Sequence, residues 1–355
     1  ANHTLGVRER GSHTMIIADD DVPFGESTCV SCGTCLQVCP TGALIDRRSA
    51  YMGGQGDYTH TLSTCMACPV GCGIDAMTRG NMLVRVNGDW EAANGGLLCV
   101  HGRFEVVEPQ AKRVTAPMVR KADGWTEVSW DEALTAVAGR LKAAGPVAGL
   151  ASPRATSEEL DAFQQLFAKA VPGSEVGLLY GEMPPALGAA AELGDLSKAD
   201  CIVVVNGQPL EDQKVVGYVV RRAAENGAKL IVVSDAPAAL DAYAQKCLSL
   251  AEIAGAAAEV ETAARPVVLY TAGLSSAVYD ALRALPAKTR FMPLYRGANT
   301  AAAARLGLSE RAVKGNALFL LAADDLPAVG DGHLPAAGFT VVQAAYQSAW
   351  TEAAS

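Results

Sequence analysis

Eight of the ten cysteines of this chain are concentrated between residues 29 and 99, at spacings that suit metal ligation. The first group has the spacing C-x2-C-x2-C-x3-C-P, and the second has C-x2-C-x3-C followed by a distant fourth cysteine. Thiols spaced so closely in a long chain indicate metal binding in a reducing compartment rather than disulfides. The groups are Cys29, Cys32, Cys35 and Cys39, and Cys65, Cys68, Cys72 and Cys99.

The first spacing is the one by which bacterial ferredoxins bind 4Fe-4S clusters. Three thiolates two residues apart can hold three corners of one cluster, and the cysteine before Pro40 then ligates a neighbouring cluster. Structural zinc prefers paired C-x2-C hooks to a triple. We therefore predict an iron–sulfur site at Cys29, Cys32, Cys35 and Cys39.

The second group is a complete ligand set for another cluster. We expect Gly71 and Gly73 to let backbone N–H groups approach its sulfur atoms. Alternating residues 82–86 and the turn residues 87–89 predict a short β-hairpin packed under the cluster. A four-cysteine zinc ribbon is the alternative, and the neighbouring ferredoxin spacing makes it the weaker one.

The pattern of apolar residues predicts the helices and strands of the fold that carries these cysteine groups. From about residue 140, buried-strand sequences alternate with amphipathic helices, which predicts an α/β fold with a doubly wound parallel sheet. The expected strands include 201–205, 230–233 and 267–270. Capping boxes are expected at Ser129 and Thr156, and the helices that follow are expected to carry Leu134 and Leu166 on their apolar faces. Cys201 and Cys247 lie in strand-like apolar sequence, where we expect them to be buried. The expected domains are a ferredoxin-like segment (1–57), a small β-rich four-iron cluster domain (58–115) and the α/β body (116–355).

Composition limits the classes of partner. Half of the residues are hydrophobic, 19% are charged, and the net charge is −9, so the chain is globular and acidic. Nucleic acid and anionic membrane surfaces need a basic footprint and are not expected partners. No apolar run reaches the roughly 18 residues of a membrane helix. We expect a cytoplasmic protein, held peripherally at the inner face of a membrane if partner subunits bring it there.

Residues 65–103 and 125–134 resemble the cluster-bearing start of the molybdopterin oxidoreductase superfamily. Residues 39–46 and their distance from Cys65 resemble two relatives in particular. One is the large iron–sulfur subunit of NADH:quinone oxidoreductase (complex I). The other is the α subunit of NAD-dependent formate dehydrogenases, with kindred subunits of hydrogenase and electron-bifurcating complexes.

In that group, a further C-x2-C-x2-C run precedes a stretch resembling residues 2–8. Because the first residue is Ala1 and not Met, we expect the sequence to be a segment of a longer polypeptide that extends upstream and beyond Ser355. The resemblance then implies that the cluster of Cys29, Cys32 and Cys35 takes its fourth ligand upstream, and that Cys39 completes an upstream cluster. The alternative is that Cys39 serves the same cluster as its neighbours.

The resemblance also bears on a molybdenum site in the α/β body. Catalytic members carry a metal-ligating Cys or selenocysteine in the region of residues 176–200, where this chain has no fitting residue. His101 stands where many of them have a lysine between cluster and pterin, and we expect it to tune a cluster or to be a plain surface residue. Gly207 lies in a partial match to a cofactor-binding turn, with a simple tight turn as the alternative. Residues 295–301 resemble the complex I subunit, which has kept the fold without molybdopterin guanine dinucleotide.

The function expected from the residues and the resemblance together is electron transfer through two or more 4Fe-4S clusters, without substrate chemistry in this chain. The implied partners are a flavin- and NADH-binding subunit, other iron–sulfur subunits, and a hydrogenase or quinone-reducing module. The alternatives are a catalytic molybdenum or tungsten formate dehydrogenase and a scaffold with structural zinc.

Overall fold

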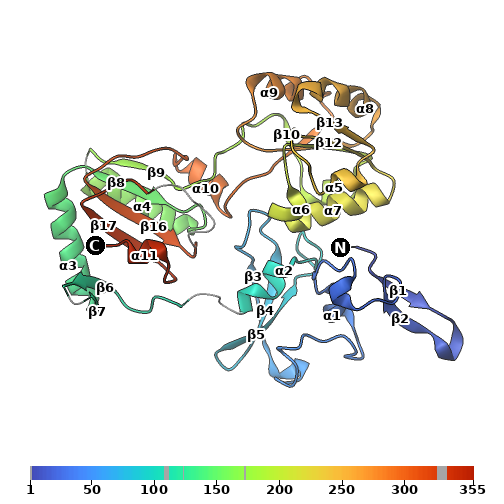
Figure 1. Ribbon diagram of the computed structural model, residues 1–355, viewed down its shortest axis with the longest axis horizontal. Coiled ribbons are helices and arrows are strands. Elements are labelled where there is room, and N and C mark those ends of the chain that lie inside the picture. Colours follow the sequence, from blue (N-terminus) through green and yellow to red (C-terminus); the bar gives the residue numbers. More distant parts are fainter. Residues whose placement is uncertain (1, 108–111, 123, 172, 326–333) are drawn as a thin grey trace. The chain divides into compact units, whose positions relative to one another are not determined.

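A computed structural model describes residues 2–107, 112–122, 124–171, 173–325 and 334–355. The chain divides into two compact units, each built from two segments (Figure 1). The cysteine unit comprises Ala1–Glu108 and Pro184–Leu294, and the second unit comprises Pro109–Met183 and Tyr295–Ser355.

The first segment of the cysteine unit is built from small antiparallel elements. Strands β1 and β2 pair as a hairpin, and β3, β4 and β5 form a three-stranded sheet in that order. The strand predicted over residues 82–86 is confirmed as part of β5. It pairs with the preceding strand β4 through a turn at Gly80, which has a φ of +59°, so the hairpin turn predicted at residues 87–89 is wrong. The elements are β1 (Leu5–Arg8), η1 (Gly11–His13), β2 (Met15–Ala18), η2 (Phe24–Glu26), α1 (Thr34–Val38), η3 (Gln55–Asp57), β3 (Thr59–Thr64), β4 (Gly73–Arg79), β5 (Met82–Gly88), α2 (Val100–Arg103) and η4 (Glu105–Val107).

The second segment of the cysteine unit forms a six-stranded parallel sheet in the order β10-β15-β14-β11-β12-β13. The short first strand β10 lies at the edge beside β15. From β11 the chain winds outward to β13 on one side and then, from β14, to β15 on the other, so the strand order reverses between β11 and β14. The elements are β10 (Ala189–Ala190), α5 (Leu193–Leu196), β11 (Cys201–Val205), α6 (Pro209–Asp212), α7 (Lys214–Glu225), β12 (Lys229–Val233), η5 (Asp241–Tyr243), β13 (Lys246–Leu248), η6 (Leu250–Ala256), α8 (Ala257–Thr262), β14 (Pro266–Tyr270), α9 (Ser276–Arg283) and β15 (Arg290–Pro293).

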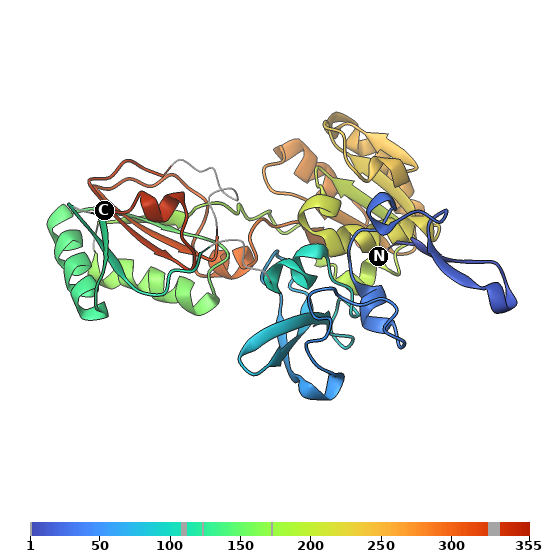
Figure 2. The same ribbon diagram turned by 60° about the horizontal axis from the view of Figure 1, so that its bottom comes forward.

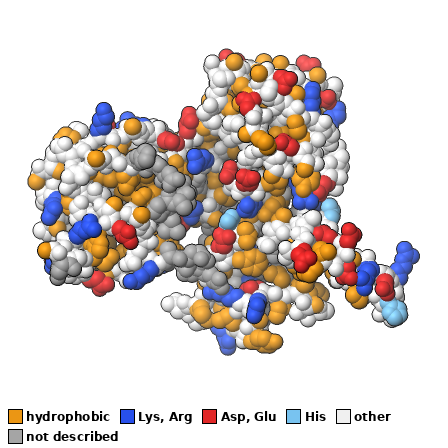
Figure 3. All heavy atoms as spheres, viewed as in Figure 1, with side chains coloured by type: hydrophobic (Ala, Val, Ile, Leu, Met, Phe, Trp, Pro, Cys, Tyr) orange, Lys and Arg blue, Asp and Glu red, His pale blue; other side chains and the backbone are white. Residues whose placement is uncertain are grey.

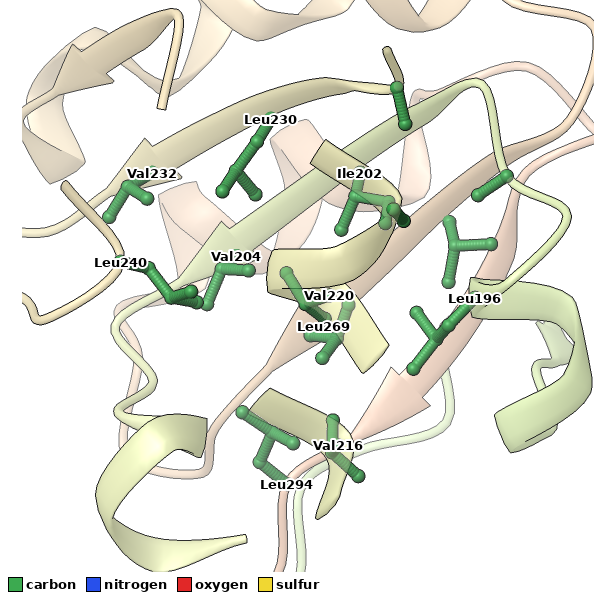
Figure 4. Close-up of a cluster of buried hydrophobic side chains, with 14 residues drawn as sticks. Leu196, Ile202, Val204, Val216, Val220, Leu230, Val232, Leu240, Leu269 and Leu294 are labelled. Atoms are coloured by element: carbon green, nitrogen blue, oxygen red, sulfur yellow. The ribbon is translucent and has the colours of Figure 1, made fainter. Parts of the chain in front are cut away.

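Both faces of this sheet are covered by helices, as the unbroken apolar strands require. On one face, Val216 and Val220 of α7 pack on Ile202, Val204 and neighbouring side chains (Figure 4). On the other face, α8 and α9 cover the alternate residues of the same strands. The core therefore determines which side of helix α7 faces the sheet.

The second unit contains a four-stranded parallel sheet in the order β17-β16-β8-β9 and a hairpin of β6 and β7. Helices α3 and α4 pack on one face of the sheet, and Trp350 of α11 lies in the core on the other (Figure 2). The elements are β6 (Met118–Lys121), β7 (Gly124–Glu127), α3 (Trp130–Ala144), β8 (Val147–Ala151), α4 (Ser157–Ala170), β9 (Glu175–Leu178), α10 (Thr300–Arg305), β16 (Ala317–Ala323), β17 (Phe339–Ala344) and α11 (Ala349–Glu352).

The α/β character of the body is confirmed, but its strands are divided between two parallel sheets where the sequence predicts one. The prediction for Cys247 is wrong, because this residue is exposed on the edge strand β13, whereas Cys201 is buried in β11. The domain boundaries expected after residues 57 and 115 stay a prediction. No helix in the described part of the chain is long and apolar enough to cross a membrane.

Candidate metal centre

The second cysteine group is assembled from the ends of β3, β4 and α2. Cys65 directly follows β3, Cys72 directly precedes β4, and Cys99 is the residue before the first turn of α2. The backbone N–H of Cys65 donates to the carbonyl of Cys72 at 2.8 Å, which closes the loop that carries Cys68. Three of these cysteines are buried, and Cys68 is half-buried.

The thiols of this group interact with one another. The pKa of Cys72 is raised, first by burial and then by the thiols of Cys68, Cys65 and Cys99. Four thiolates so close together are unfavourable in the absence of positive charge. A bound metal centre removes this penalty, because thiols must be deprotonated to ligate it.

Three cysteines of the first group are arranged around the start of α1. Gly33 has a φ of +66° and turns the chain into the helix, so that Cys32 and Cys35 lie on either side of the turn. Burial raises the pKa of Cys35, and the thiols of Cys32 and Cys29 add to this effect. The backbone N–H of Ser31 lies 3.4 Å from the sulfur of Cys29.

Cys39 has a different environment at the end of α1. The N–H of Leu44 donates to its sulfur at 3.4 Å, and the hydroxyl of Thr41 lies 3.6 Å away. These contacts lower the pKa of Cys39 to about 7. Which cluster Cys39 serves stays a prediction.

Helix α2 reaches both groups through two consecutive residues. A Cβ on Gly102 would lie 3.1 Å from the sulfur of Cys65, a tight contact that glycine avoids. The next residue, Arg103, donates from Nε to the carbonyl of Cys32 at 3.0 Å. Its side chain also crosses Gly33, where a Cβ would lie 2.8 Å from Nε.

The Arg103 guanidinium is buried and held by neutral acceptors. Nη1 donates to Oε1 of Gln37 at 2.9 Å, to Oδ1 of Asn87 at 3.3 Å and to the carbonyl of Val86 at 3.3 Å. Among the described residues, buried Nη2 has no hydrogen-bond partner. Burial lowers the pKa of Arg103 to about 10, and the thiols of Cys32 and Cys35 act against that shift. No role of Arg103 was predicted from the sequence, although this residue lies one helical turn after Cys99.

Tyr218 of α7 also lies between the two groups. It is buried, and its hydroxyl donates to the carbonyl of Val30 at 3.3 Å. Its pKa is raised by burial and then by Cys99, Cys32 and Cys29, which belong to different groups. Nothing in the local sequence of α7 indicates this contact, because it depends on how the helix packs.

The donor set fits iron–sulfur clusters. Thiolates are the ligands of such clusters, and both groups bring thiols together. In the second group, Gly102 leaves space beside the sulfur of Cys65. Within the described ranges, no three His, Cys, Asp or Glu side chains are arranged as a site for a single metal ion.

Three residues singled out from the sequence have other contacts. His101 pairs with Glu105 on the exposed side of α2. Gly207 follows β11 where the strand order reverses, and a Cβ there would lie 2.4 Å from Leu294, which gives this glycine a packing role. The expectation for Gly73 is wrong in one respect, because its N–H donates to Asn94 at 2.8 Å and not to sulfur. Cofactor binding by His101 and Gly207 stays a prediction.

A buried polar network occupies the carboxyl ends of β8, β9 and β16 in the second unit. The Tyr180 hydroxyl donates to Asp325 at 2.8 Å, and Ser152 donates to the same carboxylate. Arg154 pairs with Asp324 at 2.6 Å and with Asp325 at 3.2 Å. Tyr180 closely follows β9, within the stretch where the sequence offers no fitting metal ligand.

Comparison with protein-family models agrees with this arrangement. Residues 22–45 match the 4Fe-4S binding domain, residues 58–106 match the molybdopterin oxidoreductase Fe4S4 domain, and residues 113–277 match the molybdopterin oxidoreductase domain. The chain belongs to the molybdopterin oxidoreductase superfamily, as the resemblance implies.

Its relatives include subunits of redox complexes. An NADH-quinone oxidoreductase subunit of Rhizobium meliloti is 31% identical over 69% of this chain and 30% of its own length. NADPH-Fe(3+) oxidoreductase subunit alpha of Geobacter sulfurreducens is 31% identical over 65% of this chain and 29% of its own. A protein of Staphylococcus aureus named for formate dehydrogenase is 27% identical over 62% of this chain and 28% of its own.

This chain therefore spans less than a third of the length of these relatives. Among solved structures, acetylene hydratase from Pelobacter acetylenicus aligns with 52% of this chain and 29% of its own, at 16% identity and a TM-score of 0.38. That likeness is too weak to support a statement about fold or activity.

Proposed function

We propose that this chain is an iron–sulfur electron-transfer part of a multisubunit NAD(P)H-linked oxidoreductase. Cys65, Cys68, Cys72 and Cys99 bind one 4Fe-4S cluster, and Cys29, Cys32 and Cys35 bind another. Cys39 contributes to this second cluster or to one further upstream. The observation that carries the proposal is that one turn of α2 lies beside the sulfur of Cys65 and donates a hydrogen bond to the carbonyl of Cys32. Clusters supply one-electron chemistry, and the protein sets their distance and potential.

The proposed partners are those that the family resemblance implies, and the names of the relatives support a complex linked to NADH or NADPH. The chain relays electrons between a flavin subunit that oxidises NADH or NADPH and a second redox module, such as a hydrogenase or a quinone-reducing part. On the face shown in Figure 3, basic side chains are scattered among acidic ones, in keeping with the net charge of −9 and with protein partners rather than nucleic acid. A cytoplasmic location is part of this proposal. If the protein associates with a membrane, partner subunits hold it peripherally at the inner face.

A catalytic molybdenum or tungsten formate dehydrogenase is the second candidate, favoured by the relative named for that activity. Against it, the stretch after β9 carries Tyr180, whose hydroxyl is bonded to buried Asp325. Cys201, the next cysteine, is fully buried inside β11 and is not available as a ligand at a strand end. We infer that molybdopterin guanine dinucleotide is not bound.

One experiment separates the two candidates. The anaerobically purified chain is reduced with dithionite, reoxidised with ferricyanide, and assayed for formate-dependent reduction of benzyl viologen. Our proposal predicts reversible bleaching of the visible absorption and no formate activity. Formate oxidation together with stoichiometric molybdenum or tungsten would support the catalytic candidate instead.

A further inference from the structure

The turn of α2 joins the two thiol groups by a short path. Gly102 lies against the sulfur of Cys65, and the adjacent Arg103 is hydrogen-bonded to the carbonyl of Cys32. These two consecutive residues are enough to connect the two cysteine groups. Arg103 is therefore in direct contact with the first group.

The position of the guanidinium is fixed by the protein. Gln37 accepts from Nη1 of Arg103 at 2.9 Å and is itself held by both backbone groups of Gly88, at 2.7 and 3.0 Å. Nε donates to the carbonyl of Cys32. Among the described residues, the buried Nη2 has no hydrogen-bond acceptor, which leaves it as the nitrogen of Arg103 for a sulfur atom bound beside Cys32.

The charge of Arg103 also requires an anion. Arg103 is 3% exposed, and within the described residues its hydrogen bonds go to carbonyl and amide oxygens and not to a carboxylate. A buried cation is costly unless it is paired. The thiolates of the first group are the negative groups beside it, since Cys32 and Cys35 act on its pKa.

We propose that Arg103 is a positioning residue that raises the reduction potential of the cluster held by Cys29, Cys32 and Cys35. This inference rests on the proposed function. Reduction adds one electron without a proton, so the site becomes one charge more negative. A fixed cation and a hydrogen bond to sulfur both favour the more negative state, and such hydrogen bonds are among the factors that set cluster potentials.

The test is a redox titration followed by electron paramagnetic resonance, with iron content measured on each sample. Arg103→Gln removes the charge and should shift the signal of the first cluster to lower potential, while Arg103→Lys should retain most of the wild-type value. Asn87→Asp keeps the acceptor oxygen for Nη1 but places a negative charge beside it, and should also lower the potential. Arg79→Gln makes the same charge change on exposed β4, where Nη1 donates to Met52, and should leave both clusters unchanged.

Each outcome of the titration supports or contradicts the inference. If Arg103→Gln does not bind the first cluster, the reduction potentials of Arg103→Lys and Asn87→Asp test the inference in its place. Unchanged potentials in iron-loaded Arg103→Gln or Asn87→Asp would overturn the inference, as would equal shifts in Arg103→Gln and Arg103→Lys. Loss of iron from all three variants would assign Arg103 a purely structural role and would also overturn it. A wild-type chain without iron would instead refute the proposed function.

Discussion

The cysteines differ in whether they are expected to bind a cluster. Cys68 belongs to a group whose thiols interact with one another, whereas Cys247 is exposed on the edge strand β13. The structure therefore offers two cysteines of the same unit for a matched comparison.

Replacing Cys68 with Ser is expected to abolish one cluster signal and leave the other, because a hydroxyl is a poor substitute for a thiolate ligand. Electron paramagnetic resonance of the reduced protein measures this, and Cys247→Ser is the matched control that should keep both signals. If Cys68→Ser lost both signals while its far-ultraviolet circular dichroism was unchanged, the division into two cysteine groups would be wrong.

Asp325 is expected to be important for the stability of the second unit. Its carboxylate is fully buried and accepts from Tyr180 and Ser152 beside Arg154. Asp325→Ala removes the acceptor of the Tyr180 and Ser152 hydroxyls and one of the two carboxylates that pair with Arg154. Breaking a buried pair in this way costs about 3 kcal/mol. Urea unfolding measures the loss.

The matched control is Asp324→Ala, since Asp324 pairs with the same arginine but its side chain is 39% exposed. Its loss should be clearly smaller, because exposed ion pairs contribute little. Equal effects of the two substitutions would show that burial of the carboxylate does not determine the stability of this network.

At the level of elements, local sequence signals predicted the structure well. The apolar runs at 201–205, 230–233 and 267–270 are strands β11, β12 and β14, and Thr156 begins α4 with the expected capping box. Such features depend on neighbours in the sequence, so they can be predicted without knowledge of the tertiary structure. At Ser129, the structure shows one bond of the predicted box, from the N–H of Glu132 at 3.2 Å.

The capping box of α4 supports a stability prediction. Thr156 accepts from the N–H of Glu159 at 3.2 Å, and Glu159 accepts from the N–H of Thr156 at 2.8 Å. Thr156→Ala is expected to lower the free energy of unfolding of the second unit by about 1 kcal/mol. Ser157→Ala, one position later, should change it less. Indistinguishable urea midpoints for wild type and Thr156→Ala would contradict the prediction.

Features that depend on distant segments were missed. The strands β8 and β16 join one sheet while β11, β12 and β14 join another, and no local pattern distinguishes them. The helices predicted to carry Leu134 and Leu166 on their apolar faces leave both side chains exposed, at 59% and 37%. The role of Tyr218 likewise arises from the packing of α7 against the cysteine groups.

For the whole molecule, the candidate ligands all lie in one of the two units. The cysteines from 29 to 99 belong to the cysteine unit, and the second unit contains no cysteine. Metal binding stabilises the state that binds it, so removal of the clusters should affect the two units differently.

Anaerobic removal of iron with a chelator is expected to lower the melting temperature of the cysteine unit and leave that of the second unit near its original value. Differential scanning calorimetry measures both transitions, and Asp325→Ala identifies the one that belongs to the second unit. A single transition that shifts as a whole on iron removal would contradict independent stability of the units.

The central claim is that thiol-bound iron–sulfur clusters in the cysteine unit carry the function of this chain. The most direct measurement is quantitative analysis of iron, acid-labile sulfide, zinc, molybdenum and tungsten in protein purified without oxygen. We predict iron and sulfide in equal amounts, with the other three metals absent at stoichiometric level. A colourless protein that contains zinc in place of iron would contradict the account.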